Sequence, residues 1–384
     1  MRTRDEDGLT GVSVVLAGGG SAGHTSPLLA TAAELTRLHP DVALTAIGTP
    51  RGLENVVVPA AGLRLELIPP VPMPRRPGRD LALVPARLWR AVGEAGRILV
   101  AARADVLLGF GGYVSAPAYL AARRHRVPVV VHEQNVLPGL ANRLAARFAA
   151  GVYTAFPGTR LPRARFIGLP LRRVITDLDR HAEAAAARTR FGLRPDLPTL
   201  LVSGGSQGAV SINTAVRGAR TRLLSAGVQI LHVLGPKNFT DEIRETDPES
   251  GAAYLPVAYV EAMEDAYAAA DLMLARCGAS TVLETAAVGL PAVFVPYPHG
   301  NGEQERNAAA VVASGGGRLL PDADCTADRV HDLVLRLITD PERLAGMERS
   351  LAGVGSRDAA TVLAEETWAT AVRHPAGRAG EVTG

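Results

Sequence analysis

Glycine-rich segments occur twice in the sequence, each at a point where phosphate-binding chemistry is possible. Gly18, Gly20 and Gly23 match the spacing G-x-G-x-x-G, and residues 204–209 read Gly-Gly-Ser-Gln-Gly-Ala. Each segment follows a short apolar run and precedes a helical pattern, so the two halves of the chain echo one another. Glycines there let the backbone approach a diphosphate, and the first turn of the helix offers unpaired N–H groups. We therefore predict two loops that can bind phosphorylated ligands.

The first loop has two other interpretations. A dinucleotide site would also need an acidic residue at the end of the second strand to bind a ribose, where the sequence has Ile47, Gly48 and Thr49. That interpretation therefore loses most of its support. A turn that only joins a strand to a helix remains open.

Histidine and carboxylate side chains lie close to the first loop. His24 is placed where the loop becomes a helix, and an imidazole can take a proton from an attacking hydroxyl near neutral pH. His132, Glu133, Gln134 and Asn135 follow directly after an apolar strand, at the sheet edge where ligands of open α/β sheets bind. His24 is the candidate general base, and Glu133 is the second candidate. A histidine that only hydrogen-bonds the loop is the alternative.

A second polar segment lies in the later half of the chain. Residues 276–284 read Arg-Cys-Gly-Ala-Ser-Thr-Val-Leu-Glu and open a helix after an apolar strand, so free N–H groups can face a ligand. Glu284 is one turn into that helix, where it can accept hydrogen bonds from a ribose diol. Ordinary capping by Ser280 or Thr281 is the alternative. Gln304 begins the next helix, and its amide suits sugar hydroxyls because these need both donors and acceptors.

Metal and thiol chemistry find less support. The nine histidines form no ligand cluster, and the helix-borne H-E-x-x-H arrangement is absent from the sequence. Asp322, Ala323 and Asp324 match a D-x-D triplet, but they fall in a predicted loop beyond the last strand, so we interpret them as a cap. Cys277 is not expected to be a nucleophile, because no histidine or acid pair lies near it in the sequence. We predict no metal and no cofactor.

Apolar strands alternate with helical stretches along the chain and must position these groups. The predicted strands form two series, 13–17, 42–47, 63–68, 106–109 and 127–131, then 199–203, 228–234, 271–275 and 291–295. Such alternation predicts parallel sheets with helices on both faces. The pattern resets after residues 170–176, so we expect two doubly wound α/β domains.

Composition agrees with a globular protein of about two domains. The 384 residues are 47% hydrophobic and 21% charged, with a formal charge of +3, which favours anionic ligands only weakly. Two cysteines cannot build a disulfide framework and the charged residues 1–8 do not form a signal peptide, so we expect a reducing cytoplasm. No run reaches the ~18 apolar residues of a membrane span, so any membrane contact is expected to be peripheral.

Taken together, the ordered motifs resemble the MurG family, whose members transfer N-acetylglucosamine from UDP-N-acetylglucosamine to lipid I. The resemblance covers nearly the whole chain, and its carriers are residues 19–27, 109–117, 132–135, 168–172, 204–209, 276–284 and 304–307. It implies the GT-B fold, in which two Rossmann-like, doubly wound domains with parallel sheets face each other across a cleft. It also implies an inverting and nominally metal-independent reaction.

The resemblance further implies which residues bind the UDP-sugar. They are Ser21, Ala22, Gly23, Asn135, Arg172, Ser206, Val260, Ala279, Ser280, Thr281, Val282, Leu283, Glu284 and Gln304. By this similarity Val260 holds the uracil through backbone contacts, Glu284 the ribose and Gln304 the sugar hydroxyls.

Three positions depart from the family pattern. Ser21 stands where threonine is usual, Cys277 where serine is usual, and Leu169 where asparagine often precedes the proline. None of these changes removes a charged contact. The implied domain limits are 11–172 with a returning helix at 357–373 for an acceptor and membrane-facing domain, 173–356 for a UDP-sugar-binding domain, and disordered tails at 1–10 and 374–384.

The activity that the resemblance implies is transfer to the 4-hydroxyl of the muramyl sugar in undecaprenyl-diphosphate-linked muramyl-pentapeptide, which converts lipid I to lipid II in peptidoglycan synthesis. Two alternatives remain. One is a UDP-sugar-dependent transferase that acts on a small secondary metabolite, and the other is a nucleotide-sugar-binding protein without turnover. We expect UDP-N-acetylglucosamine and the lipid as partners, and no nucleic acid.

An anionic membrane surface is the third expected partner, at the cytoplasmic side of the cell membrane. Residues 74–90 interleave five arginines, Arg75, Arg76, Arg79, Arg87 and Arg90, with Leu81, Leu83, Val84, Leu88 and Trp89. Basic residues and tryptophan both suit a lipid interface. The alternative is an ordinary amphipathic helix that packs Leu88 and Trp89 inward.

Overall fold

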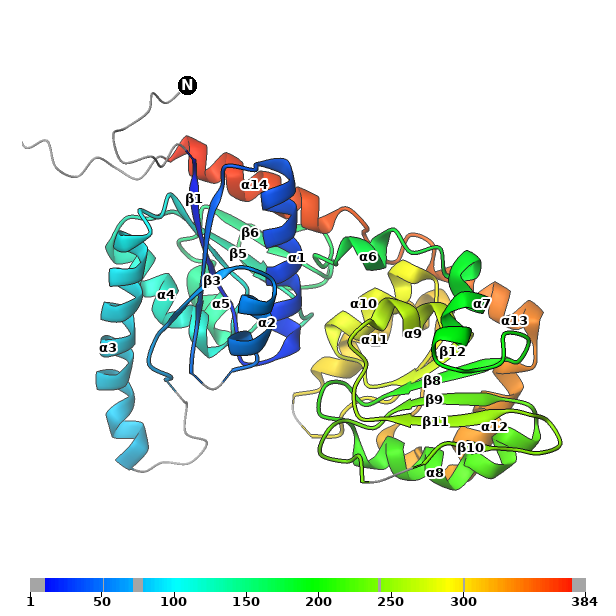
Figure 1. Ribbon diagram of the computed structural model, residues 1–384. Coiled ribbons are helices and arrows are strands. Elements are labelled where there is room, and N and C mark those ends of the chain that lie inside the picture. The colour runs from blue at the N-terminus through cyan, green and yellow to red at the C-terminus, as the bar shows by residue number, and fades with distance from the viewer. Residues whose placement is uncertain (1–10, 51, 72–78, 241–242, 300, 375–384) are drawn as a thin grey trace, which may run out of the picture. The chain divides into compact units, whose positions relative to one another are not determined.

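The computed structural model describes residues 11–50, 52–71, 79–240, 243–299 and 301–374, without the side chains of residues 79–82. The described residues form two compact units (Figure 1). One comprises residues up to Arg172 and those from Arg357 onward, and the other comprises Arg173–Ser356. The predicted disordered tails lie outside the described residues, apart from His374.

The described strands of the first unit form one parallel sheet. They are β1 (Ser13–Ala17), β2 (Ala43–Gly48), β3 (Arg64–Leu67), β4 (Val106–Gly109), β5 (Val129–Glu133), β6 (Gly151–Thr154) and β7 (Arg165–Phe166). Their order in the sheet is β3-β2-β1-β4-β5-β6-β7. The chain builds outward from β1 to β3 and then crosses to β4 on the other side, so the connections diverge at the carboxyl end of β1. Ligands of open α/β sheets bind at such a point.

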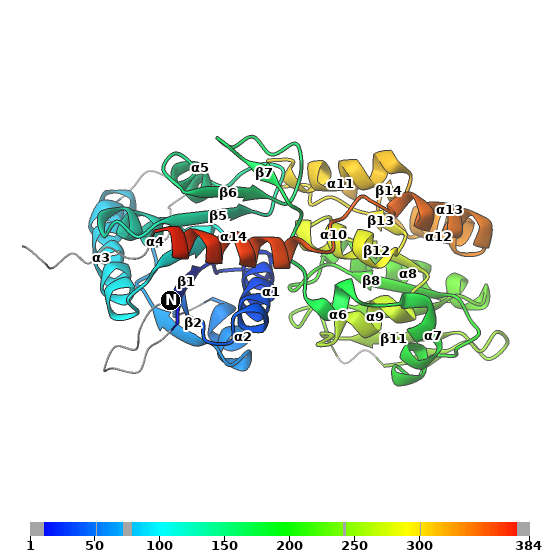
Figure 2. The ribbon, with the colours of Figure 1, turned by 90° about the horizontal axis from the view of Figure 1, so that it is seen from above.

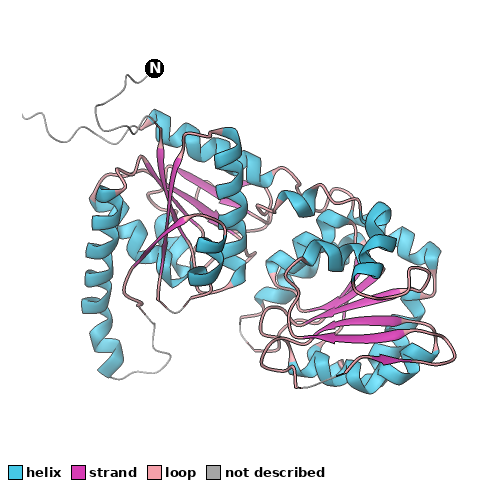
Figure 3. Cartoon of the chain, viewed as in Figure 1, coloured by secondary structure: helices cyan, strands magenta, loops and turns pink. Residues whose placement is uncertain are grey.

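Helices cover both faces of this sheet (Figure 3). They are α1 (Ala22–Leu38), α2 (Glu54–Ala60), α3 (Arg79–Ala101), α4 (Gly112–Arg124), α5 (Leu140–Ala145) and, from the end of the chain, α14 (Ala359–Arg373). The red helix α14 lies beside α1 in Figure 2, and Trp368 of α14 stacks on His39 with ring centroids 3.6 Å apart. The last helix of the chain therefore belongs to the core of the first unit.

Burial on both faces explains why the strands are apolar throughout. Val14 and Leu16 of β1 pack on the side of α14, in one core cluster with Leu363, whereas Val15 and Ala17 belong to the cluster on the opposite face. A strand that is covered on both sides loses the alternation of polar and apolar residues. No described helix is long and apolar enough to cross a bilayer.

The second unit repeats this plan. Its strands are β8 (Thr199–Ser203), β9 (Gln229–Val233), β10 (Glu245–Thr246), β11 (Ala253–Val257), β12 (Leu272–Ala275), β13 (Ala292–Phe294) and β14 (Gly317–Leu319). They pair in the order β10-β11-β9-β8-β12-β13-β14, with β10 antiparallel to β11. The first strand of the unit, β8, again lies where the order reverses.

The helices of the second unit again flank the sheet on both faces (Figure 3). They are α6 (Arg173–Thr176), α7 (Arg180–Arg190), α8 (Val210–Ser225), α9 (Met263–Ala269), α10 (Ala279–Val288), α11 (Glu303–Ser314), α12 (Ala327–Ile338), α13 (Pro341–Leu351) and the 3-10 helix η1 (Asp322–Asp324). Helix α8 follows β8 as α1 follows β1, so each unit opens with the same strand, loop and helix.

The prediction of two doubly wound α/β domains is confirmed. Each predicted strand matches an observed one to within two residues, but β6, β7, β10, β11 and β14 have no predicted counterpart. Two of these, β7 and β10, are only two residues long, too short to show a period in sequence.

One boundary changes the interpretation of the polar run at 132–135. The predicted strand ends at residue 131, whereas β5 continues to Glu133, because His132 and Glu133 still pair with Tyr153 and Thr154 of β6. Both side chains are buried. Only Gln134 and Asn135 lie beyond the strand.

Candidate active site

The glycine-rich loop of the first unit is anchored by a buried glutamate. The Glu54 carboxylate, in the first turn of α2, accepts hydrogen bonds from the Gly20 N–H at 2.8 Å and from the Thr49 N–H and hydroxyl at 3.0 and 3.1 Å. A Cβ atom added to Gly19 would lie 2.6 Å from Glu54 Oε1, so any larger residue there would have to displace the carboxylate. The Gly20 N–H is therefore occupied and is not available to a diphosphate.

Glu54 was not predicted, because the fingerprint of a dinucleotide site places its acidic residue at the end of the second strand. The first turn of α2 brings a carboxylate to the same edge of the sheet. This carboxylate binds the protein's own loop, so it gives the dinucleotide interpretation no support. The signal in the sequence was the pair Gly48 and Gly52, where an added Cβ would also collide with Glu54.

His24 lies half-buried in the first turn of α1 and is joined to two neighbouring strands. Its Nδ1 is 2.9 Å from the Phe110 carbonyl oxygen and 3.0 Å from Gln134 Oε1. Gln134 Nε2 is 2.8 Å from the His132 carbonyl oxygen and 3.2 Å from His132 Nδ1. His132 Nε2 is 2.9 Å from the Gly168 carbonyl oxygen. A continuous chain of hydrogen bonds thus runs from α1 to the ends of β4 and β5.

His132 is uncharged at neutral pH. Burial lowers its pKa to about 4, because an imidazolium loses its hydration when it is enclosed. The hydrogen bonds behind His24 therefore run through two uncharged side chains, Gln134 and His132.

Glu133 is committed to the loop that follows β5. Its Oε1 accepts from the Asn135 N–H at 3.0 Å, and its Oε2 accepts from the Gly139 N–H at 3.0 Å and from Asn142 Nδ2 at 2.9 Å. The residue is 2% exposed. A buried carboxylate with three donors shapes the loop and presents Asn135, and it is poorly placed to take a proton from a ligand. This geometry favours His24 over Glu133 as the base.

In the second unit, α10 begins directly beyond β12 with its first N–H groups uncapped by side chains. Its N-cap is Gly278, which has no side chain to accept a hydrogen bond. The capping alternative for Ser280 and Thr281 is wrong, because both residues lie inside the helix. Ser280 Oγ is buried and has no hydrogen-bond partner among the described residues, although buried hydroxyls are normally paired.

Glu284 lies on the same helix and is oriented by a tyrosine. The Tyr267 hydroxyl of α9 donates to Glu284 Oε2 at 2.6 Å. Tyr267 is almost fully buried, whereas Glu284 is half-buried. The carboxylate is therefore held at the edge of the unit by a rigid neighbour.

Arg276 connects the loops at this edge of the sheet through hydrogen bonds and an ion pair. Its Nη1 pairs with Asp322 Oδ1 at 2.5 Å and donates to the Val295 and Pro296 carbonyl oxygens at 3.2 and 3.0 Å. Its Nη2 donates to Ser211 Oγ at 2.9 Å, and Ser211 donates to Asp322 Oδ1 at 2.7 Å. The interpretation of Asp322 as a cap is wrong. Its carboxylate binds Arg276 and Ser211 instead of helix N–H groups.

The remaining predicted ligand-binding residues occupy loops and helix starts. Ser206 is exposed after β8, Val260 is buried before α9, and Arg172 is exposed at the end of the first unit's main segment. Gln304 Oε1 accepts from the Tyr297 N–H at 3.0 Å, which directs its amide nitrogen away from that loop. In each unit these groups gather beyond the carboxyl ends of the strands.

Thiol and metal chemistry gain no support. Burial raises the pKa of the Cys277 thiol to about 12 despite the adjacent Arg276 guanidinium, so the sulfur keeps its proton at neutral pH. This agrees with the expectation that Cys277 is not a nucleophile. Within the described ranges, no group of three or more His, Cys, Asp or Glu side chains could hold a metal ion.

Known proteins match the chain along most of its length. The glycosyltransferase family 28 N-terminal domain matches residues 14–154, and the glycosyltransferase family 28 C-terminal domain matches residues 199–363. The UDP-N-acetylglucosamine–N-acetylmuramyl-(pentapeptide) pyrophosphoryl-undecaprenol N-acetylglucosamine transferase of Cutibacterium acnes is 57% identical, over 92% of this chain and 96% of that protein. The chain therefore belongs to glycosyltransferase family 28 and to the family of this N-acetylglucosamine transferase. A Nocardioides transferase of the same name is also 57% identical, over 90% of this chain and 94% of that protein.

The fold agrees with the same family. The crystal structure of Acinetobacter baumannii MurG has a TM-score of 0.73 to this chain at 24% identity, and the match covers 94% of this chain and 99% of that one. At that identity the likeness concerns the fold alone. The resemblance to the MurG family predicted from the motifs is confirmed by the sequence matches.

Proposed function

We propose that this protein is a hexosyltransferase that moves N-acetylglucosamine from UDP-N-acetylglucosamine to the 4-hydroxyl of the muramyl sugar of lipid I. The product is lipid II, for peptidoglycan synthesis. The observation that carries the proposal is 57% identity, over 92% of the chain, to a transferase named for this donor and acceptor. A binding protein without turnover would not need the hydrogen-bonded chain behind His24, and that argument disfavours the second alternative.

The second unit is proposed to bind the donor. When the bond from the anomeric carbon to the diphosphate breaks, its electron pair adds negative charge to UDP, and the first turn of α10 can stabilise that charge. Ser280 Oγ offers an unpaired donor in the same turn. Glu284, oriented by Tyr267, is placed to accept from the ribose diol. Gln304 keeps amide protons for the sugar hydroxyls.

The first unit is proposed to bind the acceptor and to hold the base. His24 takes the proton of the 4-hydroxyl while that oxygen attacks the anomeric carbon from the face opposite UDP. One carbon–oxygen bond forms as the other breaks, so the configuration is inverted. Ser21, Ala22, Gly23 and Asn135 remain proposed contacts to the donor from this unit, with Arg172 at the leaving diphosphate. Ser206 is a proposed contact from the second unit.

A direct assay tests the proposed reaction. Purified protein is incubated with radiolabelled UDP-N-acetylglucosamine and a lipid I analogue, and the label is followed into the lipid product. We expect stoichiometric release of UDP and a clear preference for UDP over TDP sugars. Equal use of both nucleotides, or transfer to small aglycones but not to the lipid analogue, would favour the secondary-metabolite alternative.

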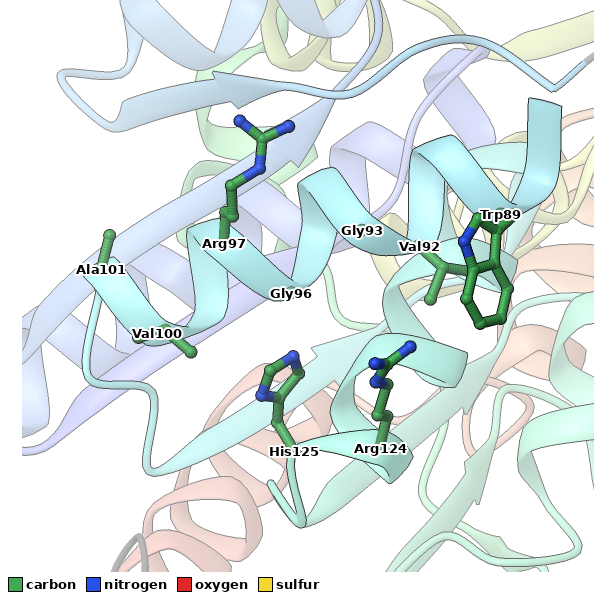
Figure 4. Close-up of a pocket in the computed structure, with 9 residues that line it drawn as sticks. All are labelled: Trp89, Val92, Gly93, Gly96, Arg97, Val100, Ala101, Arg124 and His125. Carbon is green, nitrogen blue, oxygen red and sulfur yellow. The ribbon is translucent and has the colours of Figure 1, made fainter. Parts of the chain in front are cut away.

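We also propose peripheral binding of the first unit to the anionic cytoplasmic membrane surface, through α3. Trp89 is 70% exposed, Val100 60% and Leu83 49%. A groove of about 550 Å³ separates α3 from the end of α4, and the Arg124 guanidinium lies 5.4 Å from the centre of the Trp89 ring. Figure 4 shows Arg124 and His125 pointing from α4 toward α3. Each basic residue near an anionic leaflet contributes about 1 kcal/mol.

The alternative that packs both Leu88 and Trp89 inward holds for Leu88 alone. Leu88 packs against the core of the first unit, but Trp89 does not pack inward. Arg75 and Arg76 lie outside the described residues, and the side chains of Arg79 and Leu81 are likewise not described.

Vesicle co-sedimentation tests the membrane proposal. Replacing Trp89 and Leu83 by serine and Arg90 and Arg124 by glutamate should abolish binding to phosphatidylglycerol vesicles and preserve turnover of a short-chain soluble acceptor. The matched control is Ile243→Ser, which removes a 75% exposed apolar side chain from the second unit. Undiminished binding by the fourfold variant would place the membrane face elsewhere.

A further inference from the structure

Backbone carbonyl groups decide the direction of the hydrogen bonds behind His24. A carbonyl oxygen only accepts, so the Gln134 amide must place its nitrogen toward the His132 carbonyl, 2.8 Å away. For the same reason His132 must carry its proton on Nε2, which faces the Gly168 carbonyl at 2.9 Å. His132 Nδ1 then has a lone pair, which accepts the other amide proton of Gln134 at 3.2 Å.

The orientation of Gln134 in turn determines the tautomer of His24. Its Oε1 is the atom that faces His24 Nδ1, at 3.0 Å, and the Phe110 carbonyl oxygen faces the same nitrogen at 2.9 Å. Neither oxygen has a proton to give, so Nδ1 must be the donor. A neutral imidazole carries one proton, which leaves the lone pair on Nε2.

The other edge of the His24 ring carries Nε2, and the residue as a whole is half-buried. Nε2 has no hydrogen-bond partner among the described residues. A Cβ atom added to Gly112 would lie 3.2 Å from His24 Cδ2 and 3.6 Å from Nε2, so a side chain at that position would crowd this edge. The ring is therefore held on its Nδ1 side, whereas Nε2 makes no hydrogen bond among the described residues.

Burial keeps this arrangement in place. Gln134 is 1% exposed and His132 is 0% exposed, so water does not compete for their hydrogen bonds. Because His132 stays neutral at pH 7, its Nδ1 keeps the lone pair that orients the Gln134 amide. Gln134 is also too deeply buried to touch a substrate.

We propose that Gln134 is a positioning residue, which together with the Phe110 carbonyl holds the proton of His24 on Nδ1 and so makes Nε2 the nitrogen that receives the acceptor's proton. This inference rests on the proposed role of His24 as base. In the reaction the 4-hydroxyl proton moves to the Nε2 lone pair, the freed oxygen pair forms the bond to the anomeric carbon, and UDP leaves with the electrons of the broken bond. The resulting imidazolium keeps its Nδ1 proton on Gln134 and Phe110 and later releases the Nε2 proton to solvent.

Kinetics of Gln134→Leu, alone and combined with His24→Ala, test this inference. We expect the turnover of Gln134→Leu to fall roughly 10-fold, the lower end of the usual effect of an outer hydrogen-bond partner, because the Phe110 carbonyl remains. The Michaelis constant for UDP-N-acetylglucosamine should stay within about two-fold, as expected for a group that touches no substrate. In the His24→Ala background the same substitution should cause no further loss, because it acts through His24.

A matched control is available on the same helix. Thr31 of α1 is fully buried, and its hydroxyl donates to the Pro27 carbonyl at 2.8 Å, away from the chain behind His24. Thr31→Val should leave turnover unchanged. An equal loss of turnover from Gln134→Leu with and without His24, or a raised Michaelis constant alone, would overturn the inference.

Nuclear magnetic resonance of the unmodified protein gives a test that needs no variant of Gln134. Long-range proton–nitrogen correlations of ¹⁵N-histidine distinguish the two tautomers, and the His24 signals are those that His24→Ala removes. We expect the Nδ1–H form in the wild type and a mixed population in Gln134→Leu. An Nε2–H form in the wild type would refute the positioning role, whereas full turnover of His24→Ala would refute the proposed base and leave the tautomer result standing.

Discussion

The two units share one strand order but carry different polar groups at the ends of their strands. Six strands have the order β3-β2-β1-β4-β5-β6 in the first and β11-β9-β8-β12-β13-β14 in the second, and the seventh strand, β7 or β10, is added at opposite ends of this order. In the first unit, a carboxylate holds the glycine-rich loop and neutral side chains connect His24 to the sheet. In the second, Arg276 connects the loops after β12 and β13 to Asp322 and Ser211.

The comparison indicates that the shared strand order determines where a ligand can bind, whereas the side chains at the strand ends determine which chemistry is possible there. Glu54 occupies the Gly20 N–H and places negative charge under the first loop, which disfavours a second anion. In the second unit the negative charge of Asp322 is balanced by Arg276, and the N-terminal end of α10 favours an anion. We therefore expect variants of His24 to impair proton transfer and variants of α10 and of the Arg276 cluster to impair donor binding.

The largest expected effect is that of His24→Ala. Loss of a general base typically lowers turnover about 100-fold or more, whereas the second unit should still bind the donor. Steady-state turnover and titration calorimetry with UDP-N-acetylglucosamine measure the two separately. If His24→Ala lost donor affinity but kept a high turnover, His24 would be a donor-binding residue, and the assignment of proton transfer to the first unit would be wrong.

Glu284→Ala should affect the donor instead. A lost hydrogen bond to a charged acceptor is worth about 1.5 to 3 kcal/mol, which corresponds to a rise of roughly 10- to 100-fold in the Michaelis constant for the donor. Tyr267→Phe, which removes only the 2.6 Å hydrogen bond that orients the carboxylate, should cause a smaller rise. An unchanged constant in Glu284→Ala would remove that residue from the ribose.

A third prediction uses the buried histidine of the first unit. The pKa of His132 is lowered from 6.5 to about 4 in the folded protein. Below pH 6.5 the unfolded chain therefore binds more protons than the folded one, and the stability of the unit decreases as the pH falls. Between pH 7 and pH 5 the free energy of unfolding of this unit should drop by about 2 kcal/mol. Both tryptophans, Trp89 and Trp368, lie in the first unit, so their fluorescence reports its unfolding by denaturant.

The control for that measurement is His132→Asn. The substitution destabilises the unit at all pH values but removes the titrating group, so its unfolding should depend less on pH. Equal pH dependence of the wild type and His132→Asn would show that another group controls the acid sensitivity.

The smallest expected effect concerns the Arg276 cluster. Asp322→Asn keeps an acceptor for Arg276 but weakens the charge-assisted hydrogen bond that positions the arginine, so we expect a loss of about 1 kcal/mol and a rise of roughly five-fold in the donor's dissociation constant. Asp328→Asn is the matched control, because that 84% exposed carboxylate pairs only with exposed Arg222 among the described residues. Equal donor affinity in both variants would show that Arg276 does not act through Asp322.

Sequence reasoning was most effective where the signal is local. The start of α10 was predictable from residues 276–284 because a strand, a glycine and a helical run follow each other directly. His24 could be recognised as a candidate from its place at a helix start. Glu133 could also be recognised as a candidate, but its three donors come from the folded loop, and nothing in the sequence shows that they satisfy the carboxylate.

The sequence by itself determined the two parallel sheets, the glycine-rich loops between strand and helix, and membership of the family, because each depends on short patterns of burial and backbone freedom. Only the tertiary structure decided that Glu54 binds Gly20, that Gln134 faces His24 and that Asp322 pairs with Arg276. The partners in these pairs are 34, 110 and 46 positions apart in the chain. The physical reason is that hydrogen bonds between side chains depend on distances of about 3 Å, which arise only when the strands and helices have packed.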